Sequence, residues 1–276
     1  MDELKLNSSD QNKLNALAEI INEVSNEFTS KKIVDSLTIK QQLLYLNFVV
    51  VNSYSEAIFK LCVDFRPLPA NVILRSLVES FINTAYILTH NSNKRALLFT
   101  LEDSFYRKGL AVEVLNFLKR YPQFEKGEFN SDSFQKALFK IQSEIDFYKT
   151  KYNLDYNNKK EFEKDYPRLI DRAKAVDKRI KKPDFEHIYT LVYRYLSEFG
   201  HLSMRGLNNF VRTDTNGNFE MLASQHNDIG VVISMTYTIY LYFVDQLKKK
   251  GLIQKSFNIK KFDKYWKDYF NARLTS

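Results

Sequence analysis

Apolar side chains recur three and four positions apart along most of the chain, and this spacing is typical of one buried face of an α-helix. Polar residues suited to helix capping precede several of these runs, and proline or glycine follows others. The pattern predicts helices over residues 9–29, 38–63, 70–89, 92–119, 131–152, 183–206, 227–250 and 262–272. We therefore expect an all-α fold.

Four of these helices are expected to form the centre of a bundle, because they are the most apolar. The segments 38–63 and 227–250 carry apolar residues on most faces, as buried helices do. The segments 70–89 and 183–206 are expected to pack beside them. The whole chain, residues 1–276, is interpreted as one helical domain.

Three stretches depart from this regular pattern. Between residues 207 and 224 the helical period fails, and the turn-forming residues 214–218 (DTNGN) predict a short hairpin or loop. Residues 151–182 mix eleven basic with six acidic side chains and are expected to form a charged, solvated, peripheral lobe. Residues 248–276 are expected to form a basic C-terminal tail helix.

The composition narrows the class of protein further. Only 7 Gly and 5 Pro occur in 276 residues, which leaves few turns and favours long helices. The single cysteine, Cys62, rules out an internal disulfide, and we expect a reducing, cytoplasmic setting. The formal net charge of +8 favours an anionic partner such as nucleic acid. The longest weakly polar run, Ile229 to Val244, is shorter than the roughly 20 residues of a membrane span, so no membrane association is expected.

Residues 189–203 carry several polar side chains on one predicted helix. Arg194 and His201 are seven positions apart, so they return to nearly the same helix face, about 10 Å apart along the axis. A phosphate group could lie between them. Glu198 is within one turn of both, so it can neutralise either cation and tune the imidazole of His201.

Other polar residues are candidates for supporting roles. Ser197 and Ser203 could position the phosphate. Arg75 and Glu79, one turn apart, are interpreted as an internal salt bridge that locks their helix to the helix of Arg194, or Arg75 adds a second phosphate ligand. No cluster of histidines or carboxylates indicates a metal, and no glycine-rich phosphate loop is present, so neither a metal nor a cofactor is expected.

Two segments carry a family resemblance. Residues 74–79 (LRSLVE) and 193–201 (YRYLSEFGH) resemble the two marks of an uncharacterised bacterial helical family of unknown function, over about residues 40–245. The second mark is in turn similar to the signature of the HEPN superfamily, an arginine followed after four to six residues by a histidine. Here six residues separate Arg194 from His201.

The HEPN resemblance implies a metal-independent ribonuclease that acts as a toxin or in defence against phage, with a composite site across a homodimer. His201 would then be the general acid or base, Arg194 would neutralise charge on the phosphoryl oxygens, and RNA would be the substrate. The alternative is a non-catalytic helical binding or adaptor protein in a defence or toxin–antitoxin locus. In that case Arg194, Glu198 and His201 form a structural network, and an antitoxin or another defence protein is the partner.

Overall fold

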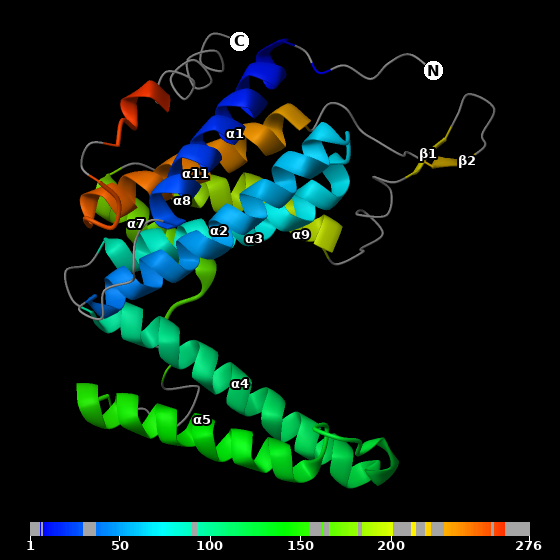
Figure 1. The fold of residues 1–276 in the computed structure, drawn as a ribbon. Helices are drawn as coiled ribbons and strands as arrows, with labels where there is room; N and C mark the ends of the chain where they lie inside the picture. Colours follow the sequence, from blue (N-terminus) through cyan, green and yellow to red (C-terminus); the bar gives the residue numbers. More distant parts are fainter. Residues whose placement is uncertain are drawn as a thin grey trace. The chain divides into compact units, whose positions relative to one another are not determined.

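Helices dominate the structure, a computed structural model that describes residues 6, 8–29, 37–89, 93–154, 162, 166–181, 184–200, 211–213, 219–221, 229–254 and 257–262. The elements are α1 (Ser8–Thr29), α2 (Ile39–Val63), α3 (Pro67–Leu88), α4 (Lys94–Arg120), η1 (Pro122–Phe124), α5 (Ser131–Tyr152), α7 (Leu169–Ile180), α8 (Asp184–His187), η2 (Ile188–Tyr193), α9 (Arg194–Gly200), β1 (Val211–Thr213), β2 (Phe219–Met221) and α11 (Ile229–Lys249). The expected all-α fold class is confirmed (Figure 1). None of the helices in the described residues is long and apolar enough to span a membrane.

The local sequence determines where several helices begin and end. Thr38 forms a capping box at the start of α2, because its hydroxyl accepts from the backbone N–H of Gln41 while the Gln41 side chain accepts from the Thr38 N–H. α3 begins at Pro67, earlier than the expected residue 70, since proline fits the first turn of a helix, where its missing N–H is not needed. α5 ends at Tyr152 and is followed by Asn153, whose left-handed conformation (φ 50°) is common after helix C-termini.

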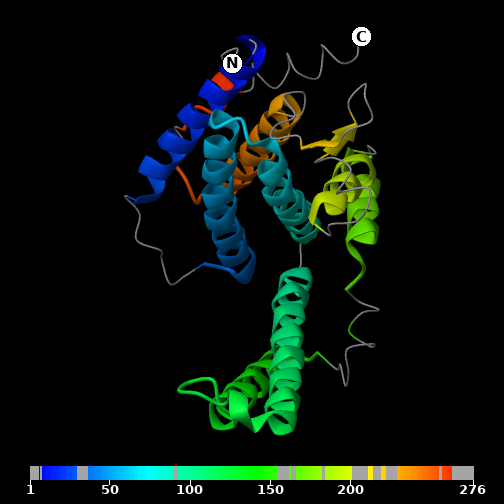
Figure 2. The ribbon, with the colours of Figure 1, turned by 90° about the vertical axis from the view of Figure 1, so that its right-hand side faces the viewer.

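One compact unit, Met1–Thr89 with Leu169–Ser276, is built around α11. α11 packs against α1, α2 and α3, and α3 also contacts α7 and α9. In Figure 2, α3 lies between α2 on one side and α9 on the other. Tyr240 and Phe243 of α11 are fully buried. The expected central position of α2, α3 and α11 is therefore confirmed, and α1 joins this core through residues such as Leu17, which is fully buried as well. The Arg194 segment was expected to be central too, but it lies at the edge of this core, since η2 and α9 pack on α3 and η2 has no buried residue.

A second compact unit, His90–Arg168, contains the helical hairpin of α4 and α5. Its small core consists of Leu98, Leu101, Ile141, Ile145, Phe162 and Tyr166. Arg107 of α4 joins the two helices by donating to both carboxylate oxygens of Glu144 on α5, at 3.0 and 3.1 Å. The expectation of one domain over residues 1–276 stays a prediction.

α7 lies within residues 151–182, the stretch expected to be a solvated lobe. Its inner side is buried against α3 through Ala173 and Val176. Arg172 is buried too, and it donates to the side-chain oxygen of Asn83 on α3 at 2.6 Å. The apolar positions of α7 lie on one face while its lysines lie on another, so this part of the stretch is a packed amphipathic helix and is not solvated on all sides.

The strands β1 and β2 form an antiparallel pair, with Val211 opposite Met221 and Thr213 opposite Phe219. This pair lies inside residues 207–224, so the predicted short hairpin is confirmed. It interrupts the otherwise helical course of the chain between α9 and α11 (Figure 1).

The basic tail, residues 248–276, is described only up to residue 262, and the remainder of the expected tail helix lies outside the described residues. Phe262 is fully buried, and its backbone oxygen accepts a hydrogen bond from the Tyr237 hydroxyl of α11 at 2.9 Å. Lys261 forms an ion pair with Glu19 of α1 at 2.7 Å. The described part of the tail is thus anchored on α1 and α11.

Candidate functional site

The expected regular helix around Arg194 is in fact assembled from short pieces. α8 is followed by the π-helical segment η2 and then by α9. The backbone N–H of Arg194 donates to the carbonyl of Tyr189, five residues earlier, as in a π-helix. The expectation of one continuous α-helix is wrong for this segment. Single-turn π segments are frequent at functional sites, where they change the direction of the residues that follow.

Asp177 of α7 fixes the start of this assembly. Its buried carboxylate accepts hydrogen bonds from the backbone N–H groups of Phe185, at 2.8 Å, and Glu186, at 2.7 Å. N–H groups in the first turn of a helix have no carbonyl partner within that helix, so Asp177 does the work of an N-cap from a neighbouring element. α7 thereby holds the chain that leads into η2.

Arg75 of α3 holds the other end of η2. Its Nε donates to the Ser197 hydroxyl at 3.1 Å, and its Nη2 donates to the Tyr193 hydroxyl at 3.2 Å. The Tyr193 hydroxyl in turn donates to a carboxylate oxygen of Glu79, at 3.4 Å. The Ser197 hydroxyl donates to the backbone oxygen of Tyr193 at 2.8 Å. We refer to these four residues, Arg75, Glu79, Tyr193 and Ser197, as the Tyr193 clamp.

The clamp corrects the expected link between the two helices. Arg75 and Glu79 were expected to pair directly, but in the described residues each binds the Tyr193 hydroxyl, which lies between them. The guanidinium carbon of Arg75 also lies 5.2 Å from the centre of the Tyr193 ring, within range of a cation–π interaction. The locking role expected of the pair is therefore carried by Tyr193 and Ser197.

Tyr193 stays protonated in this setting. Burial raises the pKa of its phenol, and the neighbouring Glu79 carboxylate raises it further, although the Arg75 guanidinium opposes the change. A protonated phenol can donate to Glu79 and accept from Arg75 at the same time. No periodic or motif signal identified Tyr193 as a site residue, although it begins the second family mark and lies four residues before Ser197.

Ser197 is committed to the clamp. Its proton is used in the bond to the Tyr193 backbone oxygen, and it accepts from Arg75. A hydroxyl has one proton, so Ser197 cannot also donate to a phosphate while the clamp is closed. The expectation that Ser197 positions a phosphate stays a prediction, and it requires the clamp to open.

Arg194 follows the clamp directly and is exposed. The next residues alternate, since Tyr195 is exposed and Leu196 is buried in the core. Among the other candidates, the backbone of Glu198 is part of α9 but its side chain lies outside what is described, and His201 and Ser203 lie outside the described residues altogether. The structure therefore brings Arg75, Glu79 and Ser197 together and places Arg194 beside them.

No group of three or more His, Cys, Asp or Glu side chains in the described ranges could hold a metal ion. The described part of the site offers a permanent cation at an exposed position, Arg194, in the residue that follows the clamped Tyr193. This arrangement can bind an anion, and it gains acid–base chemistry only if a group such as His201 is added.

Arg75→Ala is expected to lower the free energy of unfolding by about 1–3 kcal/mol, because it removes two hydrogen bonds from a charged donor and leaves the Tyr193 hydroxyl with one partner fewer. Urea denaturation of the Arg75→Ala variant and of a control variant would check this. Arg194→Ala is the matched control and should change stability by about 0.5 kcal/mol or less, since Arg194 is exposed. Equal, small losses in the two variants would show that the clamp does not hold α3 to η2 and α9.

Comparison with known proteins identifies the family to which this sequence belongs. The sequence matches "Family of unknown function (DUF5677)" over residues 41–219, which extend from α2 to the start of β2 and include both Arg75 and Arg194. No curated protein and no solved structure matches the chain. The match ends before the expected residue 245, yet it covers well over half of the 276 residues. The chain belongs to this family of unknown function, DUF5677.

Proposed function

We propose that this protein is a metal-independent ribonuclease of the HEPN type that acts as a toxin or in defence against phage. The observation that supports this most is the exposure of Arg194 directly after the Tyr193 clamp. Arg194 is therefore not one partner of a buried ion pair, the structural role that would enclose its guanidinium. An exposed arginine on a clamped segment is instead available to an anion and needs little rearrangement to bind it.

His201 supplies the proton transfer in this mechanism. It removes the proton from a ribose 2′-hydroxyl, or it donates one to the leaving oxygen. Arg194 neutralises the charge that builds up on the phosphoryl oxygens with its planar guanidinium group. Glu198 orients His201 and favours its protonated form, and Ser203 positions the phosphate.

The clamp sets the position of Arg194. Tyr193 is the residue immediately before it, and its hydroxyl is held from α3 by Arg75 and Glu79. The backbone that carries Arg194 is therefore held by α3 through the Tyr193 hydroxyl. It is also held by α7, because Asp177 binds the N–H groups of Phe185 and Glu186. Such fixation lowers the entropy lost when a phosphate is bound.

A cleavage assay in the presence of EDTA tests the proposal. Purified protein is incubated with a mixed-sequence single-stranded RNA, and fragments are resolved by gel electrophoresis. Cleavage that survives EDTA supports the metal-independent mechanism. The proposal would be contradicted by intact RNA at micromolar enzyme, or by cleavage that EDTA abolishes.

The HEPN resemblance also motivates a homodimer, since two copies of so sparse a site can surround one phosphodiester. We expect a mass of about twice 32.6 kDa in light scattering at micromolar protein. A species of 32.6 kDa alone at that concentration would remove the composite-site version of the mechanism. A cleaving monomer would then require that one copy holds the whole site.

The second candidate is a non-catalytic binding or adaptor protein in a defence or toxin–antitoxin locus, with an antitoxin or another defence protein as its partner. The observation in its favour is the clamp itself, because Arg75, Glu79 and Ser197 already satisfy one another through Tyr193. This arrangement is complete without a ligand. The EDTA assay separates the two functions, since an adaptor leaves RNA intact.

A further inference from the structure

The outer face of α5 carries a row of exposed side chains that neither the fold nor the candidate site uses. Lys136, Lys140, Ser143, Phe147 and Lys151 follow one another at intervals of four, three, four and four residues, which places them on one helix face. Phe139 lies beside this row, three residues after Lys136 and four before Ser143. All six side chains are exposed. We refer to them as the α5 stripe.

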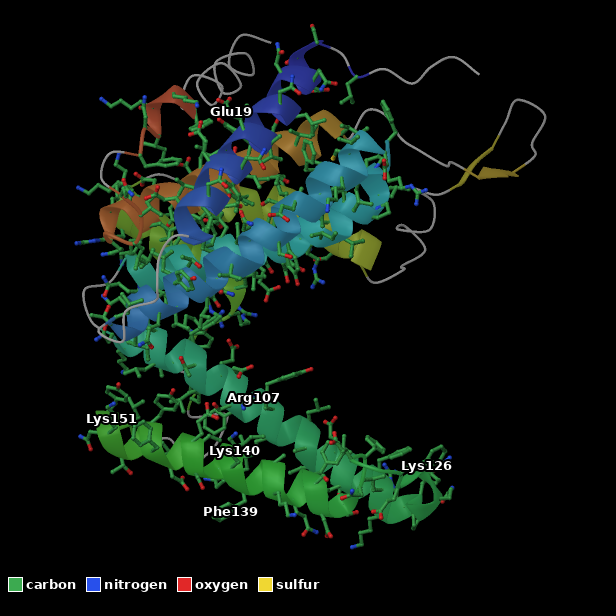
Figure 3. The ribbon with its side chains drawn as sticks, in the orientation of Figure 1. Glu19, Arg107, Lys126, Phe139, Lys140 and Lys151 are labelled. Atoms are coloured by element: carbon green, nitrogen blue, oxygen red, sulfur yellow. The ribbon has the colours of Figure 1, made fainter. Side chains whose placement is uncertain are left out.

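The two aromatic rings of the α5 stripe are unusually open to water. Phe139 is 77% exposed and Phe147 is 55% exposed. Figure 3 shows Phe139 on the side of α5 that faces away from α4, and Lys151 near the end of the helix. The ammonium group of Lys151 lies 5.0 Å from the centre of the Phe147 ring. The Phe147 ring is therefore close to a positive charge, and the Phe139 ring is open to solvent.

The charge along the α5 stripe is positive. It holds three lysines and no acidic residue. The neighbouring Glu144 turns away to bind Arg107 of α4, and Asp146 accepts a hydrogen bond from Gln142 at 2.8 Å. Glu144 is thus engaged across the hairpin, whereas Asp146 stays on α5 beside the stripe and the exposed Asp132 lies four residues before Lys136, so the three lysines outnumber these two carboxylates by one.

We propose that the α5 stripe binds single-stranded RNA, with bases stacked on Phe139 and Phe147 and phosphates held by Lys136, Lys140 and Lys151. Aromatic rings accept any base by stacking, and lysines track the phosphates, so the two kinds of side chain must alternate along one surface. The α5 stripe has that alternation. The choice of RNA over other single strands rests on the proposed function.

A membrane surface fits the same face less well. Helices that lie on membranes separate an apolar face from a basic face, so that the apolar face can enter the lipid. In the α5 stripe the lysines and the phenylalanines share one face, and burying the rings would bury the ammonium groups as well. RNA is therefore the occupant that the charge pattern favours.

The test is fluorescence anisotropy of a labelled 20-nucleotide oligouridylate with 2′-O-methyl riboses, which lacks the free 2′-hydroxyl that the proposed cleavage needs, with the full-length protein. Phe139→Ala is expected to weaken binding about 5- to 150-fold, the loss of one stacked base. Lys140→Gln is expected to lower the slope of log affinity against log salt by about 0.7, the share of one phosphate contact in a single strand. Tyr106→Ala is the matched control, because Tyr106 is 71% exposed in the same hairpin but lies on α4 close to Glu102 and Asp103. It should change affinity by less than about twofold.

Equal losses for Phe139→Ala and Tyr106→Ala, or no binding by the unaltered protein, would overturn the inference. Binding of the protein to vesicles of anionic lipid that is lost in Phe139→Ala, without RNA binding, would assign the stripe to a membrane and overturn it too. The experiment measures binding and not cleavage, so the RNA-binding proposal for the stripe and the ribonuclease proposal can be contradicted independently. A protein that cuts RNA but binds it equally well with Phe139→Ala keeps its proposed function and loses only the stripe.

Discussion

Replacing His201 with alanine is expected to lower the rate of RNA cleavage by about 10²- to 10⁴-fold, because general acid–base help from one positioned side chain is of that size. The melting temperature should stay unchanged if His201 serves the reaction alone. Single-turnover cleavage and thermal unfolding, measured on the same preparation, check both parts. His187→Ala is the matched control, since His187 is an exposed histidine on α8 in the same segment of the chain, and its loss should leave both quantities unchanged.

Arg194→Ala should share the loss of activity and keep the stability. Arg194 is exposed, so its removal leaves no buried group unpaired. Its guanidinium neutralises charge that exists only as the reaction proceeds, and such groups change the rate more than the binding of substrate. Loss of cleavage in both variants without loss of stability would indicate that the pair works on one phosphate.

The structural alternative makes the opposite forecast. If His201 is tied to Glu198 inside a network, His201→Ala should lower the melting temperature by several degrees, because a buried carboxylate without its partner is costly. If the unaltered protein cleaves no RNA and His201→Ala is destabilised, the ribonuclease assignment is wrong and the adaptor function remains. If the unaltered protein cleaves RNA and His201→Ala is stable and still cleaves it, His201 is not the general acid or base, and another group has that role.

The sequence predicts the helices of this protein well because each depends on local chemistry. The run of apolar residues in α11 is long enough to be read without any neighbour. The Thr38 capping box and the residues around Asn153 mark helix ends through bonds made within a few positions. The short β1–β2 hairpin is also local, since it follows from a turn sequence between two short runs.

The site was harder to predict because its key bonds are long-range. Tyr193 and Ser197 are bound by Arg75, more than a hundred residues earlier in the chain. Spacing on one helix identified Arg75 and Glu79 as a pair, since they are one turn apart, but it could not show that a tyrosine from another element lies between them. The spacing of residues along the sequence does not reveal which polar residue forms a hydrogen bond with a distant part of the fold.

The π-helical segment could not be predicted from the sequence for a related reason. The residues of η2, IYTLVY, contain neither proline nor glycine, so nothing in them indicates a break in a regular helix. The break instead accompanies restraints at both ends, from Asp177 on α7 and from Arg75 on α3. Such restraints belong to the tertiary structure, and the 3.6-residue period assumed for the whole segment could not include them.

Asp177→Ala is accordingly expected to have a large effect on stability, lowering the free energy of unfolding by about 2–4 kcal/mol. The change removes two charge-assisted hydrogen bonds to the N–H groups of Phe185 and Glu186, one of which belongs to a buried residue. Asp177→Asn retains an acceptor oxygen and should lose about half as much. Urea denaturation gives these values. Asp184→Ala is the matched control, since Asp184 is an exposed carboxylate in the first turn of α8, and it should cost less than about 1 kcal/mol. If Asp177→Ala and Asp184→Ala cost the same, α8 is held by its own first turn, and α7 does not position the segment that presents Arg194.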